Sequence, residues 1–145
     1  KLSGDSLGTS THFEKILKKF WRLHMDKEQL KQHMYDYVKE HKEIPIYQLE
    51  DLFKELDHDY KGKASVTNEH DKNIVFWSGW NKLTMYALIE LVKGEHLDLI
   101  YRASYVMRYL LDGRVPSLPL AITYPEYGQQ TEVPSWVPML LRVTK

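Results

Sequence analysis

The stretch that decides the fold is WNKLTMYALIELVKGEHLDLIYRASYVMRYLL, residues 80–111. Its first part repeats apolar residues at the spacing of a helix surface, which predicts a helix over 80–93. Ser78 is a suitable N-cap for this helix, and Gly94 is a suitable residue to end it. Because the apolar arc is wide, we expect this helix to lie at the centre of the domain.

Two strand-like runs follow, over 97–102 and 105–111. Tyr, Val and other apolar residues are frequent in them, and Asp112-Gly113 after the second run is a turn signal. The alternative for 105–111 is a helix with Ser104 at its N-cap. We prefer the strands, which predict a two-stranded hairpin after the central helix.

The chain before residue 80 alternates helical and extended patterns. Asp26 and Gln29 form a capping-box pattern, which predicts the start of a helix. This helix ends near Lys42, because Pro45 disfavours a helical conformation in the residue before it. Beyond it the patterns predict an extended segment at 44–46, a helix over 47–56, a loop over 57–72 and a strand over 73–77.

The two ends of the chain differ from this centre. Residues 1–10 are small and polar, which predicts a flexible lead-in. Thr11 then starts a capping box with Glu14, and an amphipathic helix follows. Its apolar face consists of Phe13, Ile16, Leu17, Phe20 and His24. Residues 112–145 are rich in proline, and we expect an extended C-terminal segment with a strand over 138–143.

Composition limits the class of protein. With 145 residues, 43% of them hydrophobic, the chain can bury the core of a single domain, which we place at 11–145. Its 20 basic and 20 acidic side chains give zero formal net charge, whereas nucleic-acid-binding domains are usually basic. The absence of Cys excludes disulfides and thiolate metal sites. The sequence shows neither an apolar run of ~20 residues nor a signal-peptide pattern, and we expect a cytoplasmic protein.

The run 30–56 resembles the opening of a winged helix-turn-helix, with a helix, the short strand EIPI and the helix YQLEDLFKEL. Residues 80–111 resemble its close, a third helix followed by a two-stranded wing. The resemblance implies an α+β domain with a winged-helix-like core over about 27–111, an extra N-terminal helix and a Pro-rich extended segment, 112–145. It also implies recognition of a nucleic acid or a protein.

Two further observations bear on this resemblance. A helix-turn-helix joins its second and third helices by about 3–4 residues, whereas residues 57–79 intervene here. The C-terminal part is also similar to small, poorly characterised proteins of phages and mobile elements in Gram-positive bacteria, a similarity that implies no activity. The residues that carry it are Tyr109, Asp112-Gly113, Leu118-Pro119 and Trp136-Val137-Pro138.

Eight residues are predicted to contact DNA in a winged-helix arrangement. Base readout uses Arg, Lys, Asn or Gln near the N-terminal end of the recognition helix, where Asn81 and Lys82 lie. A basic stripe on the first helix and the arginines of the expected wing would contact phosphates. These residues are Lys15, Lys18, Lys19 and Arg22 in the stripe, and Arg102 and Arg108 in the wing. The stripe is also what the solvent face of any amphipathic helix shows.

Motifs for other chemistry are weak. Asp57, Asp59 and Gly62 have the spacing of an EF-hand-like loop, but Lys61 and Asn68 occupy positions that need oxygen ligands and a bidentate carboxylate. The histidines lack HExxH spacing, and the sequence has no nucleophile elbow, P-loop or dinucleotide fingerprint. The sequence therefore predicts neither an enzyme nor a metal or other cofactor.

Two functions fit these observations. The leading prediction is a small regulatory or accessory protein that binds DNA. The alternative is a protein-interaction module without nucleic-acid contact, because Tyr, Trp and Met are enriched at interface centres and the chain has 10 Tyr and 4 Trp. Affinity that falls steeply as salt rises would favour DNA.

Overall fold

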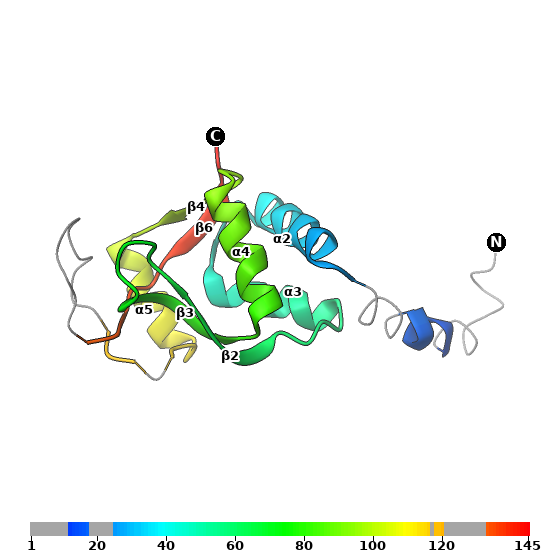
Figure 1. Ribbon diagram of the computed structural model, residues 1–145, viewed down its shortest axis with the longest axis horizontal. Coiled ribbons are helices and arrows are strands. Elements are labelled where there is room, and N and C mark those ends of the chain that lie inside the picture. The colour runs from blue at the N-terminus through cyan, green and yellow to red at the C-terminus, as the bar shows by residue number, and fades with distance from the viewer. Residues whose placement is uncertain (1–11, 18–24, 117, 121–132) are drawn as a thin grey trace.

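The computed structural model (Figure 1) describes residues 12–17, 25–116, 118–120 and 133–145. Helices and two small sheets occur together in it, which confirms the α+β class. After the helical residues 12–17, the elements are α2 (Lys27–His41), β1 (Glu43–Pro45), η1 (Ile46–Gln48), α3 (Leu49–Glu55), β2 (Lys61–Thr67), β3 (Ile74–Trp80), α4 (Lys82–Lys93), β4 (Leu97–Ile100), α5 (Ala103–Leu111), β5 (Ser135–Trp136) and β6 (Leu140–Val143). Every helix in the described part of the chain is too short or too polar to cross a membrane.

The first sheet joins strands that are far apart in the sequence. Its order is β1-β6-β4, and both pairings are antiparallel. Leu141 of β6 is in register with Ile44 on one side and with Leu99 on the other. Ile44 and Leu141 are 1% and 0% exposed, so this register lies in the core. The strand predicted at 138–143 is confirmed over Leu140–Val143, and it is the central strand of its sheet.

The second sheet has the order β2-β3-β5. β2 and β3 form an antiparallel hairpin, and β3 pairs with the short β5 in parallel. Residues 74–77 of β3 are all buried, as expected for the strand predicted at 73–77. β3 continues beyond that prediction to Trp80, which is 1% exposed.

Helix α2 follows the sequence prediction closely. Asp26 Oδ1 accepts a hydrogen bond from the Gln29 N–H at 2.8 Å, and the Gln29 side chain accepts from the Asp26 N–H at 3.0 Å. The predicted capping box is therefore confirmed. Leu30, Met34 and Val38 are each 0% exposed and form the buried stripe of the helix. This stripe belongs to the core that α2 shares with α4 and β6.

Helix α4 lies at the centre of the molecule (Figure 1), but it begins later than predicted. Its buried side consists of Thr84, Ala87, Leu88 and Leu91. The N-cap is Asn81 rather than Ser78, because β3 continues through Ser78 before the helix begins. Gly79 has a φ of 96°, in the left-handed region that favours glycine. Gly94 is the C-cap, as predicted.

The prediction of a strand over 105–111 is wrong, because these residues belong to the helix α5. The alternative prediction of a helix is confirmed, although its N-cap is Arg102 rather than Ser104. Helical spacing places Tyr109 in the core at 0% exposure. The hairpin expected from 97–102 and 105–111 does not form, because β4 pairs with β6 instead.

The prediction of a loop over 57–72 is wrong in its middle, because β2 pairs with β3 there. Within β2 only Val66 is buried. Because the other positions of this strand are at least partly exposed, polar residues occupy most of them, and the sequence of β2 resembles that of a loop. Backbone hydrogen bonds to the apolar β3 hold β2 in place, so β2 needs few apolar side chains of its own. Gly62 is required for the close approach, since a Cβ at this position would lie 2.5 Å from the Asn81 Cα.

The helix predicted after Thr11 is confirmed over residues 12–17, while Thr11 itself and residues 18–24 lie outside the described residues. The described members of its apolar face remain exposed. Phe13, Ile16 and Leu17 are 57%, 53% and 37% exposed.

The C-terminal segment contributes to the core, whereas the sequence predicts an extended addition to it. Trp136, Val137 and Met139 are 2%, 1% and 4% exposed. They precede β6, which completes the first sheet. Residues 117 and 121–132 of this segment lie outside the described part of the chain.

Candidate functional site

The outer face of α4 contains one of the predicted DNA contacts. Lys82 is exposed in the first turn, and Tyr86 is exposed one turn later. Farther along, Glu90 binds two lysines of α2, Lys27 at 2.5 Å and Lys31 at 3.2 Å. The hydrogen bond from Lys27, and then that from Lys31, hold the pKa of Glu90 below its ordinary value. The carboxylate that would repel a phosphate backbone is thus paired with lysines.

The Asn81 side chain makes three hydrogen bonds at the N-terminus of α4. Its Oδ1 accepts from the Thr84 N–H at 3.0 Å and from the Thr84 hydroxyl at 2.7 Å, and its Nδ2 donates to the Asp59 carbonyl at 2.6 Å. Because the Thr84 hydroxyl donates to Asn81, His58 Nε2 donates to that hydroxyl, across 2.8 Å. Burial lowers the pKa of His58, against the opposing charge of Asp59. Reading a base would require Asn81 to give up this N-cap.

The two arginines assigned to the wing lie around α5. Arg102 donates from Nε and Nη2 to the two carboxylate oxygens of Glu43, at 3.2 and 3.3 Å. Arg108 Nη2 donates to Gln48 Oε1 at 3.2 Å, and its guanidinium carbon lies 5.9 Å from the centre of the Tyr105 ring. The contacts with Glu43 and Gln48 connect α5 to β1 and η1.

The predicted basic stripe is only partly described. Lys15 is exposed on the helical residues 12–17, whereas Lys18, Lys19 and Arg22 lie outside the described residues. The structure brings Asn81 and Lys82 together at the start of α4 and places Arg102 and Arg108 around α5.

Sequence reasoning missed a cluster around Glu50 of α3. Trp77 Nε1 and Trp80 Nε1 donate to Glu50 Oε2 at 3.0 and 2.9 Å, and Arg114 donates to Glu50 Oε1. The Arg114 guanidinium carbon also lies 4.9 Å from the centre of the Tyr47 ring, a cation–π geometry. The two carboxylate oxygens of Glu50 therefore connect β3 and the residues after α5 to α3. No local spacing in the sequence indicates this cluster, because its members come from separate elements.

Tyr109 anchors the inner side of α5. Its hydroxyl donates to the Met139 carbonyl at 2.7 Å and accepts from the Ile46 N–H at 2.8 Å. Its ring packs edge-on against Tyr47 and Trp136, with centroid distances of 4.9 and 5.2 Å. Burial raises the pKa of Tyr109, so its hydroxyl stays protonated. These contacts fix α5 to both η1 and the residues before β6.

The outer side of α5 presents large apolar side chains to solvent. Met107, Leu110 and Leu111 are 56%, 46% and 79% exposed. Their i, i+3 and i+4 spacing places them on one side of the helix. We call these three residues the α5 face. The preferred sequence prediction did not indicate the α5 face, because a strand over 105–111 would place Leu110 and Leu111 on opposite sides.

The acidic and histidine residues do not form a metal site in the described part of the chain. No group of three His, Cys, Asp or Glu side chains there is arranged to hold a metal ion. Asp59, at an EF-hand-like position, accepts the Lys61 N–H at 3.3 Å through Oδ1.

Comparisons with protein-family models, with curated proteins and with solved structures found no match to this chain. The resemblances to a winged helix and to phage proteins therefore stay predictions.

Proposed function

We propose that this chain is a small accessory or regulatory protein that binds another protein through the α5 face. The observation that carries the proposal is the exposure of Met107, Leu110 and Leu111, at 56%, 46% and 79%. Grouped apolar side chains on a surface commonly mark interaction sites. An amphipathic helix of the partner is the class of ligand that such a helical face fits.

The same proposal includes a core of winged-helix type, which the order of elements supports. α2, β1, α3 and α4 precede β4 and β6, and β6 pairs with both β1 and β4. In this arrangement β6 is the second wing strand, and the β2–β3 hairpin is inserted between the second and third helices. α5 is then part of the connection between the wing strands. Connections between core elements are where binding residues concentrate.

Site-specific photo-crosslinking followed by direct binding tests the α5 face. A photoreactive amino acid in place of Leu111 should crosslink to the partner in cells, whereas the same amino acid in place of Gln32, exposed on α2, should not. The partner is then identified and purified. Its affinity should fall at least ~10-fold for Leu111→Glu and for Met107→Glu, because loss of an interface anchor costs about 2 kcal/mol.

Both substitutions are at exposed positions, so the thermal stability of the variants should match that of the wild type. Gln32→Glu is the control for added charge. Equal affinity of the purified partner for the wild type and both variants would contradict the proposal.

DNA binding is the second candidate function. The exposed Lys82 in the first turn of α4 supports it, and so does the exposed Lys15. A mobility-shift assay at low salt with random duplex DNA should show binding that weakens as salt rises. Changing Lys15, Lys18, Lys19 and Arg22 to Glu should abolish the shift, whereas Leu111→Glu should not. No shift at low salt would remove this candidate.

A further inference from the structure

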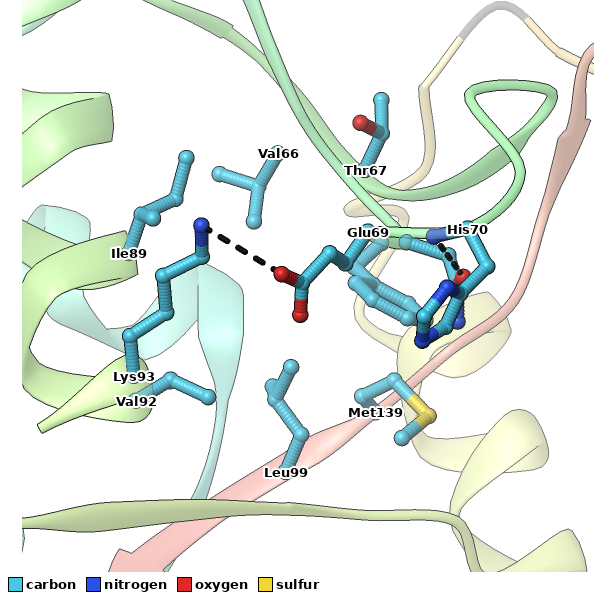
Figure 2. A pocket seen from close by; sticks show the side chains of 11 residues that line it. Val66, Thr67, Glu69, His70, Ile89, Val92, Lys93, Leu99 and Met139 are labelled. Carbon is cyan, nitrogen blue, oxygen red and sulfur yellow. Dashed lines mark hydrogen bonds and ion pairs between the residues drawn. The ribbon is translucent and has the colours of Figure 1, made fainter. Parts of the chain in front are cut away.

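A cavity lies beside the C-terminal half of α4, away from the α5 face. Its volume is about 260 Å³. Figure 2 shows its apolar side chains, which come from β2, β3, α4, β4 and the segment before β6. These are Val66, Phe76, Ile89, Val92, Leu99 and Met139. An apolar concavity with a few polar groups at its edge is the usual form of a small-molecule site.

The apolar walls suit a compact hydrophobic group. Phe76 and Met139 are only 4% exposed, so the inner part of the cavity is formed by fixed core side chains. The volume of about 260 Å³ corresponds to roughly nine water-sized groups of ~30 Å³ each. Such a volume accommodates a compact group such as the side chain of leucine, methionine or phenylalanine.

The mouth of the cavity carries one charge of each sign. Lys93 Nζ lies 3.7 Å from Glu69 Oε1, and the two side chains are 61% and 67% exposed. Figure 2 shows them pointing toward one another. An exposed pair of this kind contributes only about 0–1 kcal/mol. A ligand can therefore replace it at little cost.

The backbone that carries Glu69 is fixed before any ligand arrives. Asn68 Oδ1 accepts from the His70 N–H at 2.8 Å and from the Asp71 N–H at 3.2 Å. The Asn68 N–H donates to the Ile74 carbonyl at 2.9 Å. Glu69 is thus presented from an ordered turn, which lowers the entropy cost of binding.

We propose that this cavity binds a free α-amino acid with a large apolar side chain. The side chain fills the apolar cavity, the carboxylate binds Lys93, and the ammonium group binds Glu69. A monocarboxylate would gain Lys93 but face the charge of Glu69, and an amine would gain Glu69 but face Lys93. An α-amino acid carries both charges on one carbon, so each meets its opposite.

Isothermal titration calorimetry of the full chain with single compounds tests the ligand class. L-Leucine, L-methionine and L-phenylalanine should be titrated beside phenethylamine and 3-phenylpropionate, which each keep one of the two charges. At least one of the amino acids should bind with a measurable Kd, and both analogues should bind at least ~10-fold more weakly than phenylalanine if it binds. No binding of any amino acid at millimolar concentration would overturn the proposal, as would an analogue that binds as tightly as phenylalanine.

Variants then locate the site. Lys93→Gln and Glu69→Gln should each weaken binding at least ~10-fold, while Lys72→Gln and Glu55→Gln, exposed and outside the cavity, should leave it unchanged. Val92→Phe, which fills the cavity, should abolish binding, and its circular dichroism spectrum should report an intact fold. Equal affinity of the Lys93 and Lys72 variants would place the bound amino acid elsewhere and overturn the proposal.

Discussion

Replacing Tyr109 by Phe removes one hydroxyl and keeps the ring in the core. That hydroxyl donates to the Met139 carbonyl at 2.7 Å and accepts from the Ile46 N–H at 2.8 Å. Tyr109 is 0% exposed, so water does not replace the lost partner. A buried group left without a hydrogen bond costs about 1–3 kcal/mol. Taking about 1–2 kcal/mol for each of the two groups, we expect the free energy of unfolding to fall by about 2–4 kcal/mol.

Urea denaturation followed by tryptophan fluorescence measures this change. With a slope of roughly 1.5 kcal/mol/M, the midpoint should fall by about 2 M while the slope stays constant. Tyr86→Phe is the matched control, because Tyr86 is 49% exposed and lies on the outer face of α4. Its midpoint should stay close to that of the wild type. Equal midpoints for the two variants would refute the reasoning that the Tyr109 hydroxyl holds α5 to the core.

Three further predictions concern stability. Gly62→Ala should lower the free energy of unfolding by about 1–3 kcal/mol, since its Cβ would lie 2.5 Å from the Asn81 Cα. Thermal unfolding should show no such loss for the control variant Lys63→Ala. Equal losses in the two variants would contradict a steric clash at residue 62. Burial lowers the pKa of His58, so the unfolded chain takes up the proton first and stability is lost as pH falls below about 6.5. The difference between the denaturation midpoints at pH 5 and pH 7 should be smaller for His58→Gln than for the wild type. An equal difference in the two proteins would contradict this role of His58. Burial raises the pKa of Tyr47 to about 12, so stability should fall as pH rises from 10.0 toward that value. In a series of denaturation midpoints over this pH range, Tyr47→Phe should lose less stability than the wild type. An identical loss in the two proteins would contradict this role of Tyr47.

The elements that could be predicted from the sequence have local causes. The start of α2 is set by the capping box of Asp26 and Gln29, and its buried stripe repeats every four residues. The stop of α4 is set by Gly94. All of these signals lie within a few residues of the feature they predict, so they need no knowledge of the rest of the fold.

The errors concern features that depend on distant partners. β2 is polar and is a strand because β3 lies beside it. Residues 105–111 form a helix, because β4 finds its partner at β6 and Tyr109 finds its hydrogen bonds at Ile46 and Met139. Neither pairing is visible in a window of a few residues.

The candidate sites show the same limit. The residue types of the α4 face could be predicted, but the engagement of Asn81 with Asp59 depends on a contact with the segment before β2. The cavity is formed where the β2–β3 hairpin meets α4, β4 and the segment before β6. Its mouth pairs Glu69 with Lys93, which come from different elements.

The central position of β6 has a consequence for biosynthesis. Translation produces β1 and β4 long before β6, which must then insert between them. Until residue 143 has left the ribosome, the first sheet cannot close, and both of its older strands keep unsatisfied backbone edges. Open edges of this kind can pair with other chains. A nascent chain stalled before Leu140 should therefore depend on chaperones, and the emergence of β6 from the ribosome should be the event that lets the first sheet close.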